Sequence, residues 1–320
     1  MKKIAIGALI MVCLATVLTG CANKEEPKEN AQVENNVEKD KNEVSEKVFA
    51  EFTKVLEGNE TLETKKFILE NIEKVDKKTA DKMVMKYETL LKDNFDKLSN
   101  KFNSIGYFDV VNNTMDENYE LNLDLIKDEK IKKEVMEVVA SGYTFEMLEG
   151  SYYLTMDYSM INDTFGTYLS ENIKPYYELR KKELENPTFV EEYVSIDFEE
   201  IKNRAVTLEK FIRDNKDFEN KEDLKDMMRW YIEALLRIDH FGDIVDYETG
   251  KVDNVVKNTY EELKESDLKI LKHVSQEMDN LLSEYKYVLK SDDQDAAQKI
   301  NELRFKLSDE VAKKIEEYYY

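Results

Sequence analysis

Apolar side chains recur at intervals of three and four residues along much of this chain, and that spacing is typical of one face of an α-helix. The segment 78–102 gives the clearest example, with the apolar positions Met83, Tyr87, Leu90, Leu91, Phe95 and Leu98. Turn residues are scarce, because only 9 Gly and 3 Pro occur in 320 residues. A β-sandwich would need many more of them. We therefore expect an all-α protein, built as a helical bundle or as a body of paired helices.

Several residues mark the expected ends of helices. Asp197–Glu200 resembles a capping box, and Gly142 follows a predicted helix as its C′ residue. Two long helices are expected at 266–289 and 293–318, and the short connection between them predicts antiparallel packing. Trp230 lies next to the apolar stripe of its predicted helix, so it is expected to anchor the core.

The segment before the helical body has a different composition. Residues 22–44 contain mainly Lys, Glu and Asn and few apolar side chains. Such a segment cannot bury enough apolar surface to offset the entropy of ordering it, so residues 21–44 are expected to form a disordered tether. Helical spacing begins at Ser45, and the body is expected to comprise an N-terminal subdomain, 45–141, and a C-terminal subdomain, 142–320.

The first 21 residues combine positive charge, an apolar run and a cysteine. Lys2 and Lys3 precede a run from Ile4 that ends in Leu18-Thr19-Gly20-Cys21. This order resembles the lipobox of bacterial lipoproteins, and the run is short for a membrane-spanning helix. The resemblance implies that residues 1–20 are a signal peptide and that the Cys21 thiol is diacylated, for example with palmitate. It places the protein on the extracytoplasmic face of the cell membrane, attached through its lipid anchor.

Several short sequence motifs lie between about residues 60 and 290. They are Glu70-Asn-Ile-Glu-Lys-Val75, Thr79-Ala-Asp81, Glu149-Gly-Ser-Tyr-Tyr153, Asp157-Tyr158, Tyr168-Leu-Ser-Glu171 and Asp246-Tyr-Glu-Thr249. Together they resemble a group of uncharacterised extracytoplasmic lipoproteins of Gram-positive, spore-forming bacteria. The resemblance implies the location and a helical fold, and it implies no particular activity.

Charge and composition exclude several classes of function. The formal charge of -22 becomes -24 without Lys2 and Lys3, so nucleic acid is not an expected partner. The predicted mature chain has no cysteine beyond Cys21, and its 2 histidines cannot form an HExxH zinc site. The sequence contains no P-loop, GxGxxG or GxSxG motif, so neither a cofactor nor a catalytic residue is predicted.

Aromatic side chains are concentrated in residues 143–177. Tyrosine offers an apolar ring with a hydroxyl at its edge, which suits the binding of sugars, peptides or proteins. Tyr152, Tyr153, Asp157 and Tyr158 are predicted to line a binding groove, with the carboxylate orienting a polar ligand. The alternative is that these rings fill the junction between helical layers.

Acidic residues also gather around one histidine. His240, Asp243 and Asp246 are the candidate metal ligands, because Ca²⁺ takes several oxygen ligands from acidic loops. Their spacing differs from that of an EF-hand, and a histidine near a helix end more often interacts with the helix dipole. No metal site is therefore predicted.

These observations favour a non-enzymatic binding or interaction protein of the cell envelope, with a protein or envelope partner. The alternative is a receptor for a peptide, a sugar or another small solute that uses the aromatic segment 143–177. A more remote alternative is an envelope hydrolase, for which Glu149 and Asp157 are one of many carboxylate pairs in an acidic chain.

Overall fold

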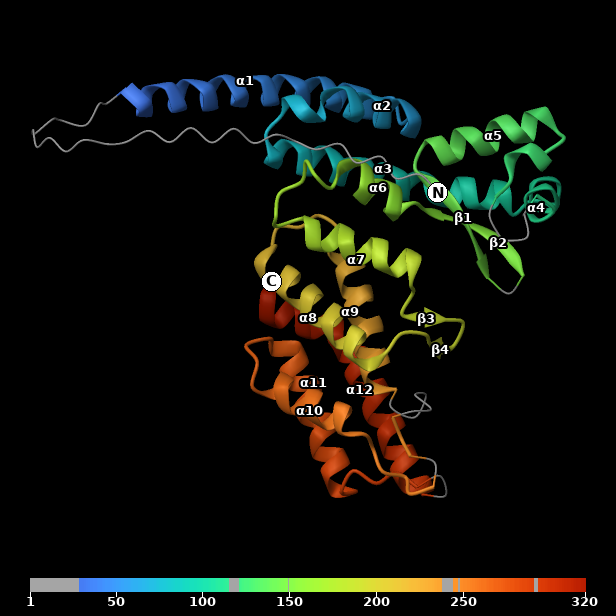
Figure 1. The fold of residues 1–320 in the computed structure, drawn as a ribbon, viewed down its shortest axis with the longest axis vertical. Coiled ribbons are helices and arrows are strands. Elements are labelled where there is room, and N and C mark those ends of the chain that lie inside the picture. Colours follow the sequence, from blue (N-terminus) through green and yellow to red (C-terminus); the bar gives the residue numbers. More distant parts are fainter. Residues whose placement is uncertain (1–28, 115–120, 149, 238–243, 247, 291–292) are drawn as a thin grey trace, which may run out of the picture. The chain divides into compact units, whose positions relative to one another are not determined.

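The computed structural model describes most of the chain (Figure 1). The described residues are 29–114, 121–148, 150–237, 244–246, 248–290 and 293–320, with side chains from residue 41 onward apart from those of Ile105 and Leu148. This part of the chain contains twelve α-helices and two short β-hairpins. The expectation of an all-α, mostly helical protein is confirmed.

The chain begins, in its described part, with three helices and a 3₁₀ turn. They are α1 (Glu29–Glu57), α2 (Thr61–Asn71), η1 (Ile72–Lys74) and α3 (Lys77–Phe102). Helix α3 starts where Asp76 caps it, with 2.8 Å between its Oδ1 and the backbone N of Thr79. Helix α1 starts at Glu29, whereas helical spacing in the sequence starts at Ser45. Helical backbone therefore extends into the segment assigned to the tether, and the 21–44 tether stays a prediction.

A β-hairpin follows two further helices. The elements are α4 (Ile105–Asn112), η2 (Leu123–Leu125), α5 (Glu129–Ala140), β1 (Tyr143–Leu148) and β2 (Ser151–Met156). The two strands pair antiparallel, with Tyr143 opposite Met156. Gly142 joins α5 to β1 at a φ of +107°, which glycine adopts without strain, and its predicted place after the helix is confirmed. The hairpin differs from the helical expectation, because strands of six residues are too short to separate period two from helical spacing.

The remaining elements include a second, smaller hairpin. They are α6 (Tyr158–Phe165), α7 (Lys174–Glu185), β3 (Phe189–Val190), β4 (Tyr193–Val194), α8 (Phe198–Asp214), α9 (Lys221–Leu236), α10 (Asn254–Lys264), α11 (Lys269–Glu284) and α12 (Gln294–Tyr319). The predicted cap of α8 is confirmed, since Asp197 Oδ1 lies 2.7 Å from the backbone N of Glu200. Helix α12 matches the helix predicted at 293–318 to within one residue at each end, whereas α11 is shorter at both ends than the helix predicted at 266–289.

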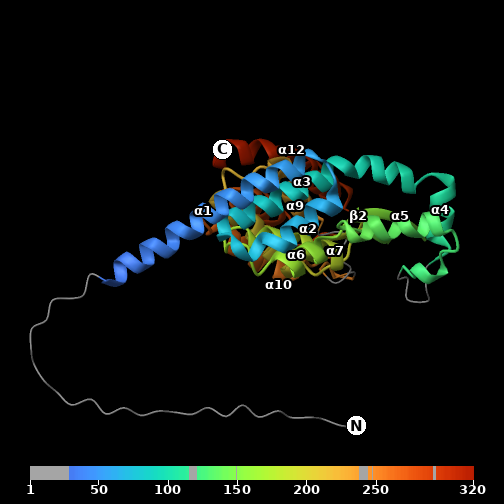
Figure 2. The same ribbon diagram turned by 90° about the horizontal axis from the view of Figure 1, so that it is seen from above.

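Residues 41–320 form one compact unit with a continuous apolar core. Helix α9 packs against α8 and α12, α10 packs against α11, and α3 packs against β2. Figure 2 shows α4 and α5 at the end of α3, beside β2. The predicted boundary between residues 141 and 142 falls inside this unit, and the division into two subdomains stays a prediction.

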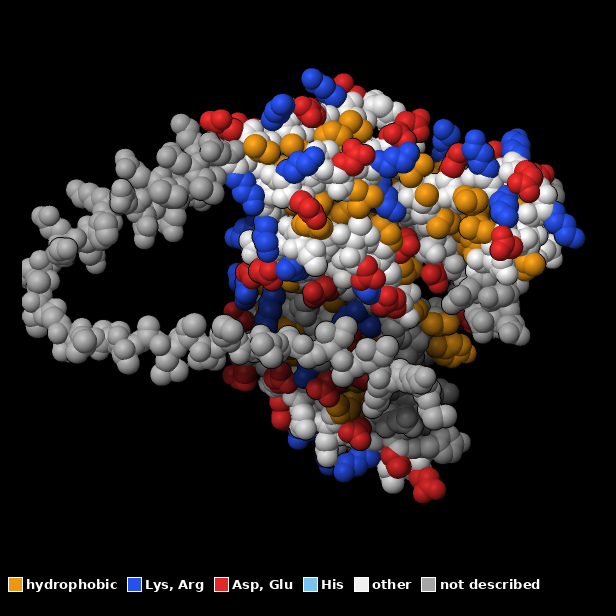
Figure 3. All heavy atoms as spheres, turned by 45° about the horizontal axis from the view of Figure 1, so that its top comes forward, with side chains coloured by type: hydrophobic (Ala, Val, Ile, Leu, Met, Phe, Trp, Pro, Cys, Tyr) orange, Lys and Arg blue, Asp and Glu red, His pale blue; other side chains and the backbone are white. Residues whose placement is uncertain are grey.

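The surface mixes charged and apolar side chains. On the face shown in Figure 3, basic and acidic side chains are interspersed, with smaller groups of apolar side chains between them. Trp230 belongs to the surface as well, since it is 53% exposed. The expectation that it anchors the core is wrong, because the buried positions of α9, such as Leu224, Met228 and Tyr231, share a helix face that excludes position 230.

Candidate functional site

The four residues predicted to line a groove do not share one face of the molecule, and two of them are buried. Tyr152 and Tyr153 are neighbours on β2 and point to opposite faces of the hairpin, so Tyr152 is buried and Tyr153 is 40% exposed. The Asp157 carboxylate caps α6, with 2.7 Å between its Oδ1 and a backbone N of the first turn. Tyr158 follows it and is buried. The structure therefore does not bring the four side chains together.

The buried tyrosines of this region instead surround the carboxylate of Glu88. Glu88 lies on α3 and is 0% exposed. Tyr158 and Tyr176 donate their hydroxyls to Glu88 Oε1, with O–O distances of 2.9 and 2.6 Å. Tyr177 donates to Oε2 at 3.1 Å. The Glu88 cluster, which we define as this carboxylate and the three tyrosines, thus joins α3 to α6 and α7.

Basic side chains balance the charge of Glu88. The Nζ of Lys92 lies 2.8 Å from Glu88 Oε1, and Lys92 also pairs with Asp223 of α9. The Nη2 of Arg180 donates to the Tyr158 hydroxyl at 2.8 Å. Burial raises the pKa of each cluster tyrosine well above its ordinary value, so the hydroxyls stay protonated and donate. The cluster is occupied by its own partners, and its rings fill the junction between helices.

A second buried carboxylate, Glu209 of α8, is paired in a different way. It is 0% exposed and accepts the backbone N–H groups of Ile270 and Leu271, with N–O distances of 2.7 and 2.9 Å. Both N–H groups belong to the first turn of α11, where a helix carries positive partial charge. Tyr319 of α12 donates its hydroxyl to the same carboxylate. Burial raises the pKa of Glu209, and these three hydrogen bonds oppose part of that rise.

The candidate metal ligands are described only in part. His240 and Asp243 lie outside the described residues, as does Cys21. The Oδ1 of Asp246 accepts both the N–H and the hydroxyl of Thr249, at 2.7 and 2.6 Å. Among the described residues, no group of three or more His, Cys, Asp and Glu side chains is placed to hold a metal ion. None of the helices in this part of the chain has both the length and the apolar character needed to cross a membrane.

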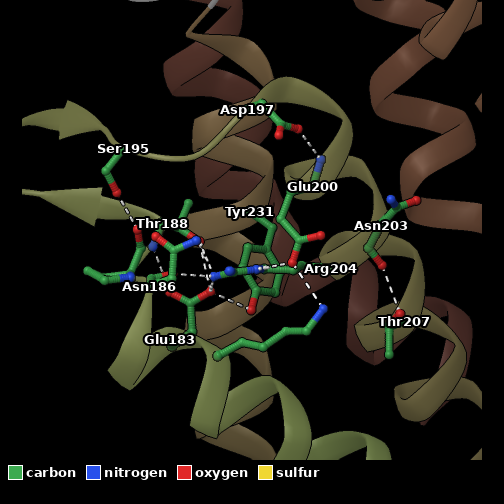
Figure 4. Close-up of polar contacts among 12 residues, drawn as sticks. Glu183, Asn186, Thr188, Ser195, Asp197, Glu200, Asn203, Arg204, Thr207 and Tyr231 are labelled. Carbon is green, nitrogen blue, oxygen red and sulfur yellow. Dashed lines mark hydrogen bonds and ion pairs between the residues drawn. The ribbon is translucent and has the colours of Figure 1, made fainter. Parts of the chain in front are cut away.

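Arg204 of α8 organises the region where α7 leads into the β3–β4 hairpin (Figure 4). Its side chain is 2% exposed, and it donates to Glu183 Oε1 at 2.6 Å and to Glu200 Oε1 at 2.9 Å. Tyr231 of α9 donates its hydroxyl to the same Glu183 oxygen at 2.9 Å. The N–H of Thr188 donates to Glu183 Oε2, also at 2.9 Å. These bonds fix the start of the hairpin against three helices.

The β3–β4 hairpin presents an exposed apolar pair. Val190 and Tyr193 are opposite each other across the strands and are 46% and 65% exposed. The two-residue turn between them places Glu191 at a φ of +56°, a left-handed conformation that is strained for a residue other than glycine. Arg237, the C-cap residue of α9, supports the turn, because its Nη1 donates to the carbonyl oxygen of Glu192 at 2.6 Å.

A row of three charged side chains, with an aromatic ring at each end, continues from this hairpin across α9 to α12. The guanidinium carbon of Arg237 lies 5.3 Å from the ring centre of Phe189, and its Nε lies 2.9 Å from Glu233 Oε1. The Nε of Arg304 lies 3.4 Å from the same Glu233 oxygen. The guanidinium carbon of Arg304 lies 5.0 Å from the ring centre of Phe305, which is 59% exposed. We call these five side chains the arginine row.

Trp230 lies on the same side of α9 as the arginine row. It precedes Glu233 by three residues and Arg237 by seven, and this spacing places the three side chains along one side of a helix. We define the β3–α9–α12 face as the arginine row together with its exposed neighbours Val190, Tyr193 and Trp230. Its exposed side chains are mainly aromatic, and its framework is a set of ion pairs and arginine–ring contacts.

The β3–α9–α12 face is not among the sequence predictions, because three separate segments supply it and only the fold brings them together. Two local signals are nevertheless present in the sequence. Arg304-Phe305-Lys306 places an aromatic ring between two cations, and Trp230 stands outside the apolar stripe of its helix. A large aromatic residue outside the apolar stripe is a surface residue, and such residues are candidates for partner binding.

Comparison with known proteins gives no family assignment. No protein-family model matches the chain, and no curated protein or solved structure matches it. The residues and their geometry are therefore the basis for a functional proposal.

Proposed function

We propose that this protein is a lipid-anchored interaction protein of the extracytoplasmic membrane face, which binds a protein or another envelope partner and catalyses no reaction. The support for the anchor is the order of Lys2 and Lys3, the apolar run and Leu18-Thr19-Gly20-Cys21. Because diacylation supplies more than one acyl chain, the anchor would be stable without a membrane-spanning helix.

The observation that carries the binding role is the β3–α9–α12 face. It exposes Trp230, Tyr193 and Phe305 on a framework of paired arginines. Tryptophan, tyrosine and arginine are enriched among the residues that dominate protein–protein binding energies. The buried carboxylates Glu88 and Glu209, in contrast, are occupied by internal donors, which gives no support to a catalytic role.

The lipid anchor is tested by metabolic labelling of cells with an alkyne analogue of palmitate. We expect the wild-type protein to take up the label and Cys21→Ala to lose it, because the thiol is the acceptor. Cys13→Ala is the matched control and should keep the label, since residue 13 leaves with the signal peptide. Retention of the label by Cys21→Ala would show that the lipid is attached elsewhere or that the resemblance is misleading.

The binding role is tested by cross-linking in intact cells. An interaction protein should give discrete cross-linked species that contain a second protein or an envelope polymer. A small-solute receptor should instead gain roughly 2.7 kcal/mol of stability at a hundredfold excess of ligand over its Kd, measurable by thermal shift with peptides, sugars and amino acids. We expect no such gain. Absence of any cross-linked species, together with a clear thermal shift, would replace this proposal by the receptor alternative.

A further inference from the structure

We infer that the β3–α9–α12 face binds a basic segment of a partner protein that also carries apolar side chains. This inference deepens the proposed function and rests on it, because it names the partner chemistry of that same surface. It is carried by three observations, which are the exposure of the aromatic residues, the fixed geometry beneath them and the charge around them.

Three aromatic residues of the face are more than half exposed. Tyr193, Phe305 and Trp230 are 65%, 59% and 53% exposed, and they come from a hairpin and two helices. Single exposed apolar residues are ordinary on protein surfaces. Here, however, the arginine row connects the hairpin to both helices through an unbroken series of contacts from Phe189 to Phe305. A partner that covers this row would bury all three rings at once.

The geometry beneath the rings is fixed before any partner arrives. Arg237 contacts the hairpin turn, the Phe189 ring and Glu233, and the Ser308 hydroxyl donates to Glu233 Oε2 at 2.7 Å. The Arg204 contacts hold the base of the same hairpin (Figure 4). A surface that is already ordered loses little conformational entropy on binding, which favours affinity.

Exposed acidic residues outnumber exposed basic ones in the segments that form the face. Five exposed acidic residues are near its exposed side chains in the sequence: Glu191, Glu192, Asp226, Glu302 and Asp309. Among the described residues, Glu191, Glu192 and Asp309 have no cationic side chain within 4.0 Å. The exposed cations beside the face are Arg229, which lies 3.6 Å from Asp226, and Lys306, so the rim is net negative.

The net negative charge of the rim favours some classes of binding partner over others. A basic segment is attracted to the rim, and its apolar side chains can cover the rings. A nucleic acid or an anionic lipid surface is repelled by the rim and by the formal charge of -22. A second copy of the chain, paired about a two-fold axis, would bring one acidic rim against the other. A basic protein segment is therefore the favoured occupant.

The test uses Trp230 as a reporter, because it is the only tryptophan of the chain. The probe is a short peptide of alternating arginine and leucine, titrated into the full mature protein in a zwitterionic detergent. We expect a saturable shift of the Trp230 emission to shorter wavelength, which weakens as salt is added. A matched peptide of alternating glutamate and leucine should cause no shift. No shift with the arginine peptide would overturn the inference.

Variants locate the binding on this face. Phe305→Ala and Tyr193→Ala should each weaken peptide binding about fivefold or more, measured with a labelled peptide. Leu69→Ala and Met136→Ala are matched controls, since these residues are 48% and 49% exposed on α2 and α5. They should leave the affinity unchanged. Equal weakening in controls and face variants would refute the location.

A charge-reversal variant distinguishes specific binding at this face from non-specific adsorption of the peptide. Asp309→Lys changes an exposed residue and should weaken the arginine peptide while strengthening the glutamate peptide. An unchanged preference would contradict the role given to the acidic rim. A shift of Trp230 emission with protein concentration alone would show that a second copy covers the face, and this result would also overturn the inference.

The two proposals fail in distinguishable ways. If wild-type protein and Phe305→Ala form the same cross-linked species in intact cells with equal yield, this inference fails and the proposed function stands. If neither protein is cross-linked to any partner, the proposed function itself fails. Selective loss of the cross-linked species in Phe305→Ala supports both.

Discussion

Glu88 and Glu209 are both fully buried carboxylates that accept tyrosine hydroxyls, yet their surroundings differ in charge. Glu88 accepts three hydroxyls and pairs with Lys92. Glu209 accepts one hydroxyl and two backbone N–H groups, and no side-chain cation lies within 4.0 Å of it among the described residues. The positive end of α11 takes the place of a cation.

One fold can therefore bury a carboxylate in two ways, either beside a cationic side chain or at the N-terminus of a helix. An ion pair depends on both partners, because deleting one leaves the other charge buried alone. At Glu209 the N-terminus of α11 supplies partial charges and Arg213 acts from beyond 4.0 Å, and together with the hydrogen bonds they offset only part of the desolvation, so the carboxyl binds a proton more readily than in water. The two sites should therefore respond differently to substitution and to pH.

The largest expected effect is that of Glu88→Ala. The variant leaves three buried tyrosine hydroxyls without their acceptor and removes one of the two carboxylates that pair with Lys92. We expect a loss of about 3–5 kcal/mol in the free energy of unfolding, measured by urea denaturation. Glu178→Ala changes an exposed residue of α7 and should stay within about 0.5 kcal/mol of wild type. A loss below about 1 kcal/mol in Glu88→Ala would mean that the cluster does not depend on its carboxylate.

A smaller effect is expected from removing one tyrosine hydroxyl at each site. Among the described residues, Tyr319 is the only side-chain donor to Glu209, so Tyr319→Phe should reduce the unfolding free energy by about 1.5–3 kcal/mol. Tyr177→Phe should reduce it by only about 0.5–1.5 kcal/mol, because Glu88 keeps two hydroxyls and Lys92. Tyr193→Phe, at an exposed position, serves as the control in the same urea titrations. Equal losses at the two buried sites would remove the contrast between them.

The subtlest expected effect is a pH dependence specific to Glu209. Burial raises the pKa of this carboxyl above its ordinary value of 4.5, so the folded chain holds the proton more tightly than the unfolded chain. This contribution to stability is fully present below the ordinary value and is lost as pH rises through the raised pKa. Glu209→Gln does not titrate there. The stability of wild type relative to this variant should therefore fall as the pH rises above 4.5, the ordinary pKa of the carboxyl, in urea titrations.

Tyr319→Phe provides a second test of the same linkage. The Tyr319 hydroxyl lowers the pKa of Glu209, so its removal should move the pH-dependent loss to higher pH. A stability difference between wild type and Glu209→Gln that is constant with pH would contradict the assignment of this titration to Glu209.

Much of the helical framework follows from local sequence. The three-and-four spacing gives α3, Asp197 marks the start of α8, and Gly142 marks the end of α5. The β1–β2 hairpin does not follow, because pairing between strands decides it. The sequence pattern wrongly predicts a buried Trp230, because a residue beside an apolar stripe lies near the boundary between buried and exposed positions.

The candidate site is much harder to derive from sequence. Residue type identifies the aromatic segment but does not say whether a ring points into the core, as Tyr176 does, or to the surface, as Tyr153 does. Glu88 is one of 69 acidic residues, and its tyrosine partners lie 70 to 89 residues further along the chain. Only tertiary packing selects it. The arginine row has the same character, because Arg237 and Arg304 meet Glu233 from different helices.

The long sequence separation between the buried carboxylates and their hydrogen-bond donors affects how the chain can fold during synthesis. Tyr177 follows Glu88 by 89 residues, and Tyr319 follows Glu209 by 110. A polypeptide that emerges from its N-terminus exposes each carboxylate long before its donors exist, and burying it in the meantime is unfavourable. Early compaction around α3 or α8 is therefore disfavoured. We therefore expect the growing chain to stay open until its later helices arrive, which is a state in which a polypeptide can be threaded across a membrane.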